Sequence, residues 1–299
     1  MGQILAGLRV NLVHFLKSQI PAPVKRRLRQ LVTGGGHPSV PAVKGLGRAT
    51  DIYVWIADGD IDTIIPLHNF FSTLFPALDT ATEASLELFS SDGRPLGSTK
   101  VKVPQMGAPA IRVSELIAQF GAKDSTFGSV IWDLKPPPQV KTQLAGRDEP
   151  FLLWDRSYIG YVGSEGQVSF VHGIDKARVI TEKEASISWP MRAKDSFTAA
   201  PEIPLLLAET EWTDVILQNR SGIPRRMTLE VRDTKGDSRE WAADLARYGT
   251  NRFRLDPTEL GDLDLAEPVR LRMSGLPTRY GRAVIFKRFA SGAISAMHC

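Results

Sequence analysis

The chain has 299 residues, of which 42% are hydrophobic and 23% charged, as expected for a globular protein with a sizeable core. Residues 1–50 hold eight basic and no acidic residues, whereas the remaining 29 basic residues face 33 acidic ones, so a leader of charge +8 precedes a body of charge −4. The acidic balance of the body disfavours nucleic acid as a partner, and the single cysteine, Cys299, excludes an intramolecular disulfide.

The leader begins with an amphipathic pattern over residues 3–20, where apolar residues recur at helical spacing. Pro21 and Pro23 end this predicted helix, and four cations follow within residues 25–29. A basic amphipathic helix lies in the membrane interface with its apolar face down, so we expect residues 1–32 to bind an anionic membrane surface. Two alternatives stay open: a helix docked on the rest of the protein or on a partner subunit, and an organelle transit peptide.

The chain lacks the sequence signals of a membrane-spanning or secreted protein. No apolar run approaches the roughly 18 residues that span a bilayer, and polar residues interrupt the leader where a signal peptide needs a compact apolar region. A chain with one cysteine suits a reducing compartment. We therefore expect a cytoplasmic protein that is peripheral to a membrane, with a flexible linker from Gly34 to about Gly47 joining leader and body.

From Ile52 onward, short runs of strand character alternate with turn signals at roughly 8–12-residue spacing, which is typical of β-sandwiches. Three pairs of segments recur in the same order: 57–62 with 208–213, Ser85–Leu88 with Thr228–Val231, and Ser169–His172 with Ser295–His298. Gly93 and Gly236 follow the second pair at equal distances. We expect an all-β protein of two tandem antiparallel β-sandwich units, at residues 51–190 and 200–299, preceded by the N-terminal amphipathic helical leader of residues 1–50.

The first unit contains a proline-rich insertion, residues 135–150, which has no counterpart in the second unit. Polyproline is stiff and cannot complete the hydrogen bonds of a sheet, so we expect this segment to form an exposed excursion. The joint between the two units is expected between Ile187 and Pro204, where prolines interrupt the strand pattern.

Five segments carry a resemblance to a known family: Tyr53–Gly59, Leu86–Gly93, Val101–Pro104, Ile111–Leu116 and Phe127–Ile131. They resemble the sensory rhodopsin transducer family over residues 52–175 and, more faintly, over 203–298. The resemblance implies a small cytoplasmic β-sandwich that assembles as oligomers, and the family is also similar to sandwiches that bind sugars. The leader, the insertion and the duplication depart from the family, so we carry over its fold and not its membrane photoreceptor partner.

Asp58 and Asp60 follow the first predicted strand in an Asp-x-Asp pattern. Such carboxylates suit the divalent cation of a nucleotide-sugar transferase, but that class also needs alternating strands and helices, which are not visible. A calcium loop is a second interpretation, although Thr63 stands where the turn glycine is needed and Asn69 where a glutamate is needed. The simplest interpretation is a solvated acidic turn.

His172 and His298 close the two units at equivalent positions. Together with the Asp58–Asp60 turn and its echo at Glu209 and Glu211, they would build two equivalent metal- or sugar-binding sites, because histidine is a common metal ligand. The alternative is a half-buried histidine on each final strand, bonded to a backbone carbonyl. The echo of the acidic pair suits a feature of the fold better than a single catalytic pair.

Aromatic side chains on a sheet face are candidates for stacking on sugar rings. Most of the six tryptophans are expected in the core. Trp154, Tyr158 and Tyr161 follow the insertion and alternate poorly, so they are the best candidates for exposed aromatic residues.

Arg252 and Arg254 are two residues apart on a predicted strand, so both side chains point to one face. Guanidinium groups in this arrangement suit an anionic ligand such as a carboxylate or a phosphate. The alternative is a solvated face on which these arginines pair with nearby acids of the protein itself.

The sequence contains no nucleophile elbow, phosphate loop or zinc-protease motif that would name a reaction. We predict a non-catalytic ligand-binding or adaptor protein without a cofactor, which recognises a glycan or a protein partner and is compatible with a homo-oligomer. Its expected ligand contacts are Asp58, Asp60, His172, Glu209, Glu211, His298, Trp154, Arg252 and Arg254. The alternative function is a metal-assisted enzyme of glycan metabolism that uses the acidic turns and the terminal histidines.

Overall fold

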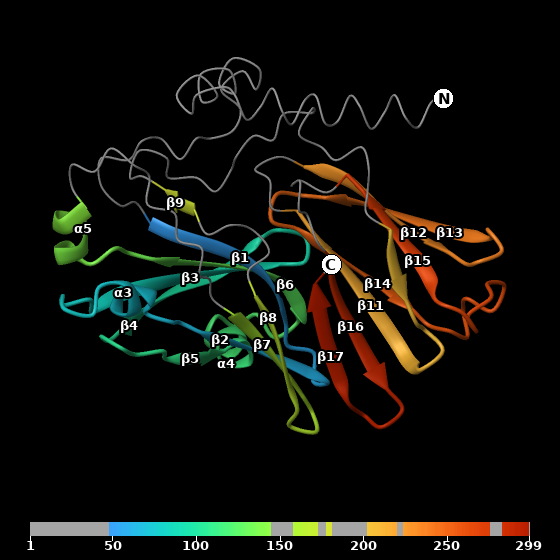
Figure 1. Ribbon diagram of the computed structural model, residues 1–299, viewed down its shortest axis with the longest axis horizontal. Helices are drawn as coiled ribbons and strands as arrows, with labels where there is room; N and C mark the ends of the chain where they lie inside the picture. The colour runs from blue at the N-terminus through green and yellow to red at the C-terminus, as the bar shows by residue number, and fades with distance from the viewer. Residues whose placement is uncertain are drawn as a thin grey trace, which may run out of the picture. The chain divides into compact units, whose positions relative to one another are not determined.

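The apolar runs of the body form four antiparallel sheets, which pair into two β-sandwiches in the computed structural model (Figure 1). The structure describes residues 48–144, 158–172, 178–180, 202–219, 224–275 and 283–298, which belong to one compact unit from Val43 to Cys299. The predicted leader helix, the predicted linker and most of the predicted joint between the units lie outside the described residues. No helix in the described ranges has the length and apolarity needed to cross a bilayer.

The first sandwich consists of a sheet in the order β4-β3-β6-β1-β9 and a sheet in the order β5-β2-β7-β8. Its elements are β1 (Arg48–Ile56), β2 (Ile61–Pro66), α3 (Phe70–Leu74), β3 (Thr82–Ser90), β4 (Pro95–Val103), β5 (Ala110–Arg112), α4 (Val113–Gln119), β6 (Phe127–Leu134), α5 (Pro138–Leu144), β7 (Tyr158–Gly163), β8 (Val168–His172) and β9 (Arg178–Ile180).

The second sandwich consists of sheets in the orders β10-β15-β12-β13 and β14-β11-β16-β17. Its strands are β10 (Ile203–Leu205), β11 (Thr210–Gln218), β12 (Arg225–Arg232), β13 (Ser238–Leu245), β14 (Thr250–Leu255), β15 (Val269–Ser274), β16 (Val284–Phe289) and β17 (Ile294–His298). Strand β15 shows why these segments are strands, because its buried Val269, Leu271 and Met273 alternate with exposed Arg270, Arg272 and Ser274.

The two sandwiches have the same topology. If β1 to β8 are matched in chain order with β10 to β17, both sheet orders of the first sandwich reappear in the second, with β9 as an extra edge strand. Gly93 and Gly236 occupy the equivalent β3–β4 and β12–β13 turns with φ values of +80° and +99°, a conformation that favours glycine. The predicted all-β fold of two tandem antiparallel sandwiches is therefore confirmed.

The two sandwiches share a hydrophobic core. Strand β11 is buried on both faces: Val215 and Leu217 point into the second sandwich, whereas Trp212 and Ile216 belong to the same apolar cluster as Trp55 of β1. All residues of β11 except Glu211 are buried, although its continuous apolar run is only Val215–Leu217.

An aromatic pair marks the centre of the contact between the sandwiches. Phe286 of β16 meets Tyr161 of β7 edge to face, with ring centroids 4.6 Å apart. The Tyr161 hydroxyl donates a hydrogen bond to the Val54 carbonyl at 2.8 Å, so the ring is fixed from both ends. The prediction that Tyr161 is exposed is therefore wrong, because its side chain is 1% exposed and its hydroxyl has a buried partner.

The prediction of an exposed proline-rich excursion is wrong for the first part of the insertion. Pro136 and Pro137 are buried, and Val140 of helix α5 is fully buried within the core of the first sandwich. Prolines cannot extend a sheet ladder, but they pack well as apolar side chains, and here they lead a short helix back onto the sandwich. Residues 145–157 lie outside the described residues.

Candidate functional site

The outer face of the β5-β2-β7-β8 sheet is unusually apolar for a surface exposed to solvent. Tyr158, Val168 and Phe170 expose 46%, 45% and 59% of their surfaces on this face. Partly buried apolar residues of the same face continue it across the sheet: Ile64, Pro66 and Val162. We call these six residues the aromatic face. A contiguous exposed apolar surface of this kind often marks a site that binds a ligand or another protein.

Gly160 forms the floor beneath the most exposed ring. It lies opposite Phe170 in the β7–β8 register, and a Cβ atom at this position would come within 2.9 Å of Phe170 Cε1. The Phe170 ring therefore lies over the backbone of β7, which has no side chain at that point. One side of the ring packs on the strand and the other faces solvent, which creates a flat apolar platform.

Polar groups border the aromatic face on its β5 side. Asp62 accepts hydrogen bonds from the Ser114 hydroxyl at 2.8 Å and from Arg112 Nη1 at 3.1 Å. Arg112 lies beside Ile64 in the β2–β5 register, and about half of its side chain is exposed. On the opposite side, the His172 ring meets Tyr158 edge to face.

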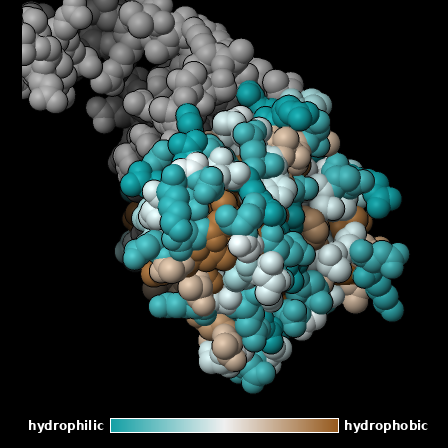
Figure 2. All heavy atoms as spheres, turned by 90° about the vertical axis from the view of Figure 1, so that its right-hand side faces the viewer, coloured by the Kyte–Doolittle hydropathy of each residue, from teal (hydrophilic) through white to brown (hydrophobic). Residues whose placement is uncertain are grey.

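The outer face of the β10-β15-β12-β13 sheet has the opposite character. It presents exposed ion pairs between Arg226 and Asp244 and between Arg232 and Glu230, with N–O distances of 3.0 and 2.5 Å. Viewed from the side on which β12, β13 and β15 lie in Figure 1, the surface is covered mainly by hydrophilic side chains (Figure 2). The arginines of this face fit the interpretation of a solvated surface that pairs with the protein's own acids.

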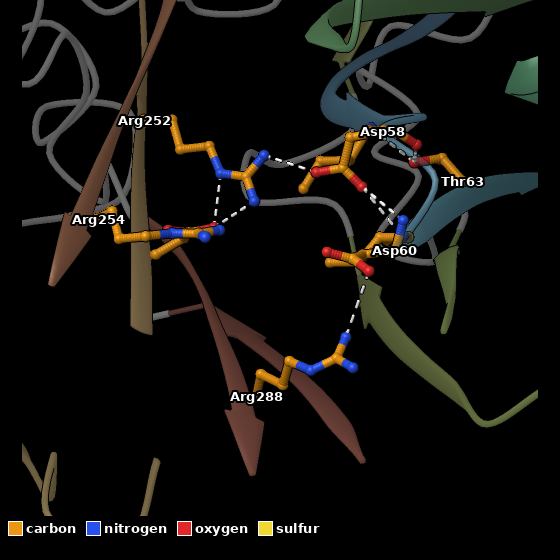
Figure 3. Close-up of polar contacts among 9 residues, drawn as sticks. Asp58, Asp60, Thr63, Arg252, Arg254 and Arg288 are labelled. Atoms are coloured by element: carbon orange, nitrogen blue, oxygen red, sulfur yellow. Dashed lines mark hydrogen bonds and ion pairs between the residues drawn. The ribbon is translucent and has the colours of Figure 1, made fainter. Parts of the chain in front are cut away.

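The predicted acidic turn lies between β1 and β2 and faces arginines of the second sandwich (Figure 3). Asp58 Oδ1 closes the turn by accepting from the backbone N–H of Asp60 and Ile61 at 3.2 and 3.0 Å. The other oxygen, Oδ2, accepts from Arg252 Nη1 at 2.7 Å. Thr63 fixes the base of the turn, because its hydroxyl exchanges two 2.8 Å hydrogen bonds with the Ile56 backbone.

Asp214 of β11 binds both predicted arginines. Its carboxylate is fully buried and accepts hydrogen bonds from Arg252 and from Arg254 Nε and Nη2, the latter two at 2.8 Å. The hydrogen bond that Arg254 donates to Asp214 raises the pKa of Arg254, and burial opposes this effect. The Arg254 guanidinium also lies 4.1 Å from the centre of the Trp212 ring. Arg252 and Arg254 do share one face, as predicted, and their acidic partners belong to the protein.

Glu209 and Glu211, the second acidic pair, lie in different surroundings. Arg288 of β16 lies between the two sandwiches, with Nη1 3.5 Å from Asp60 Oδ1 and Nε 3.2 Å from Glu211 Oε2. Glu209 lies in the equivalent turn between β10 and β11 and is exposed. The acidic turn between β1 and β2 thus contributes two carboxylates to the contact between the sandwiches.

The two predicted histidines meet in one pair and not in two equivalent sites, which corrects the expectation. His172 ends β8 and His298 ends β17, and their Nε2 atoms are 2.7 Å apart. The pair is remote from the acidic turn, because Ile61 pairs with Gly163 at one end of β7, whereas His172 pairs with Tyr158 at the other. Five residues of strand separate these ends by about 17 Å.

The alternative function, a metal-assisted enzyme, requires the acidic turn and a terminal histidine in one site, and this separation does not provide such a site. Asp58, Asp60 and His172 do not converge, and no group of three or more histidine, cysteine or acidic side chains in the described ranges is placed to hold a metal ion. Trp154, the remaining predicted contact, lies outside the described residues.

Two functional candidates were missed by the sequence reasoning. Asp214 directly precedes the apolar run Val215–Leu217 of β11, and an acid at such a position is a signal of a buried, paired carboxylate. Phe170 alternates with buried Val171 in β8. Its position at an exposed site of a strand was readable from that alternation.

Comparisons with known proteins add little to this picture. No protein-family model and no curated protein matches the chain. Among solved structures, a proposed β-galactosidase from Bacteroides fragilis is similar at 13% identity, over 85% of this chain and 32% of that one, with a TM-score of 0.19. A β-glucuronidase from Bacteroides uniformis is similar at 10% identity, over 87% of this chain and 27% of that one, with a TM-score of 0.18.

The chain spans about a third or less of the length of these solved structures. At such TM-scores the similarities carry no argument about what this chain binds or catalyses. The resemblance to the sensory rhodopsin transducer family is not tested by them and stays a prediction.

Proposed function

We propose that this protein is a non-catalytic binding protein that recognises a glycan through the aromatic face of its first sandwich. The observation that supports this most is the pair of exposed rings, Phe170 and Tyr158, on one flat sheet surface. The Gly160 floor holds the Phe170 ring open to solvent on one side, as a stacking partner for a sugar must be.

The chemistry of a pyranose ring suits this surface. A sugar presents an apolar face of C–H groups that stacks on an aromatic ring, and hydroxyl groups around its edge that need hydrogen-bond partners. Arg112 supplies N–H donors at the β5 side of the platform. The flat, open surface favours an extended chain over a single small sugar.

The acidic turn supports a binding function over catalysis. Asp58 and Asp60 are engaged by Arg252 and Arg288, so a divalent cation at this turn would have to displace a guanidinium group from each carboxylate.

Glycan binding is expected to depend on the two exposed rings. We expect the full chain to bind at least one class of oligosaccharide on an array of cello-, manno-, xylo- and galacto-oligosaccharides. Phe170→Ala and Tyr158→Ala are each expected to weaken that binding about fivefold, because one aromatic stacking contact contributes roughly 1 kcal/mol. Isothermal titration calorimetry with the strongest ligand of the array measures the change.

The matched control is Met106→Ala, which removes an apolar side chain that is 74% exposed on the β4–β5 connection, outside the aromatic face. It is expected to leave glycan affinity unchanged. Equal binding by wild type and by both aromatic variants, or an array without any bound oligosaccharide, would contradict the proposal.

The membrane-facing part of the proposal rests on the leader, residues 1–32. We expect the chain to float with anionic liposomes and not with neutral ones, because each cation near an anionic surface contributes about 1 kcal/mol. Changing Lys25, Arg26, Arg27 and Arg29 to serine is expected to abolish flotation. If the leader is docked on the protein by apolar burial, its contact does not depend on lipid charge or on salt. Flotation that survives these substitutions would contradict a charge-driven membrane contact.

A further inference from the structure

The end strands of the two sandwiches meet along a seam. Strands β8 and β17 occupy equivalent positions in the duplicated topology and lie side by side (Figure 1). The Ser169 hydroxyl donates to the Ala296 carbonyl at 3.0 Å and accepts from the Ala296 N–H at 2.9 Å. Gln167 Nε2 donates to the Gly292 carbonyl at 2.9 Å, so a hydrogen bond also holds the end of the seam opposite the histidines.

The histidine pair at the end of the seam has the geometry of a chelate. The ring centroids of His172 and His298 are 4.1 Å apart, but their Nε2 atoms are only 2.7 Å apart, so the rings converge toward their Nε2 ends. A metal ion lies about 2 Å from an imidazole nitrogen, along the outward direction of the ring. The two distances agree with an arrangement in which both rings, whose planes are 80° apart, direct their Nε2 atoms at one ion.

The separation of the nitrogens is close to what one ion requires. With metal–nitrogen bonds of about 2.0–2.1 Å, two ligand nitrogens lie roughly 2.9 to 3.3 Å apart in square-planar or tetrahedral coordination. The Nε2 atoms need to open by a few tenths of an ångström, which a small rotation of each side chain provides. His172 is exposed at the end of β8, so an ion has a path to the pair.

We propose that His172 and His298 together bind one transition-metal ion of the class that favours imidazole, Zn²⁺, Cu²⁺ or Ni²⁺. The ion replaces the hydrogen bond between the two Nε2 atoms, and the proton on the donor Nε2 moves through solvent to Nδ1 of the same ring, so that both neutral imidazoles present an Nε2 lone pair. Solvent or an external ligand completes the coordination. Because each sandwich contributes one histidine, the bound ion joins the two halves of the duplicated fold.

The test is zinc binding by the full chain in a Cys299→Ser background, which removes the thiol at the position after His298 as a source of binding. Calorimetry with zinc chloride on chelator-treated protein is expected to show one site per chain. His172→Ala and His298→Ala are each expected to weaken zinc binding at least tenfold. His68→Ala, which removes an exposed histidine of the β2–α3 connection, is expected to leave it unchanged.

A second readout separates chelation from a change in folding. Cu²⁺ bound to the wild-type chain is expected to give an electron paramagnetic resonance spectrum with coupling to two imidazole nitrogens, and His172→Gln is expected to reduce this to one. His172→Gln keeps a polar side chain of similar length, so it tests the ligand without removing the packing. Zinc affinity that is equal in wild type, His172→Ala and His298→Ala, or a copper spectrum without paired imidazole coupling, would overturn the proposal.

Discussion

Replacing Asp214 with asparagine is expected to lower the free energy of unfolding by about 3 kcal/mol, the largest effect that we expect of any single charge among the described residues. The carboxylate is fully buried and binds Arg252 and Arg254 together, and the Arg252 side chain is only 16% exposed. Asparagine keeps the shape but not the charge, so it leaves a buried guanidinium with Asp58 as its remaining acidic partner. We choose the lower end of the usual range because 44% of the Arg254 side chain is open to solvent.

The matched control is Asp244→Asn. Asp244 also pairs with an arginine, Arg226, at 3.0 Å, but its side chain is 75% exposed. An exposed ion pair of this kind contributes about 0–1 kcal/mol, so a change of that size at most is expected. Urea unfolding followed by circular dichroism measures both variants. Equal losses for Asp214→Asn and Asp244→Asn would mean that the buried cluster is not what joins the sandwiches.

Phe286→Ala is expected to cost about 3–5 kcal/mol, because it opens a cavity where the two sandwiches share one core. The Phe286 ring is fully buried and packs edge to face on Tyr161. Since the shared cluster joins Phe286 with Trp55 of the first sandwich, we also expect the wild-type body to unfold in one transition. Tryptophan fluorescence and circular dichroism should then give the same urea midpoint.

Phe170→Ala is the matched control, because it removes the same type of side chain from a position that is 59% exposed. Its expected cost is about 1 kcal/mol or less. Two well-separated transitions in the wild type, or a Phe286→Ala variant as stable as Phe170→Ala, would show that each sandwich folds on its own core.

The shared core also bears on the proposed binding function. Phe170 lies on β8, which is the last strand of its sheet, and exposed edge strands are prone to unwanted pairing and to fraying. The second sandwich contacts this edge through the hydrogen bonds of Ser169 with Ala296 of β17 and of Gln167 with Gly292 in the β16–β17 turn. The duplication thus provides a second sandwich that supports the platform of the first.

The sequence alone determined the repeated architecture of this protein. Period-two alternation and turn glycines are local properties, and both are encoded within a few residues of each strand. Gly93 and Gly236 identified equivalent turns because both require the same left-handed conformation. The order of the echoed segments then implied the order of the strands, and the structure repeats it.

Only the tertiary structure decided which side chains meet. Arg252 and Asp58 are 194 residues apart in the chain, and His172 and His298 are 126 apart, so no local pattern links them. Alternation states that a residue is buried or exposed, but not which surface covers it. Trp212 and Ile216 of β11 read as core residues, yet their neighbours belong to the other sandwich. Partners of this kind are fixed by the packing of two preformed sheets, a property of their shapes and charges in three dimensions.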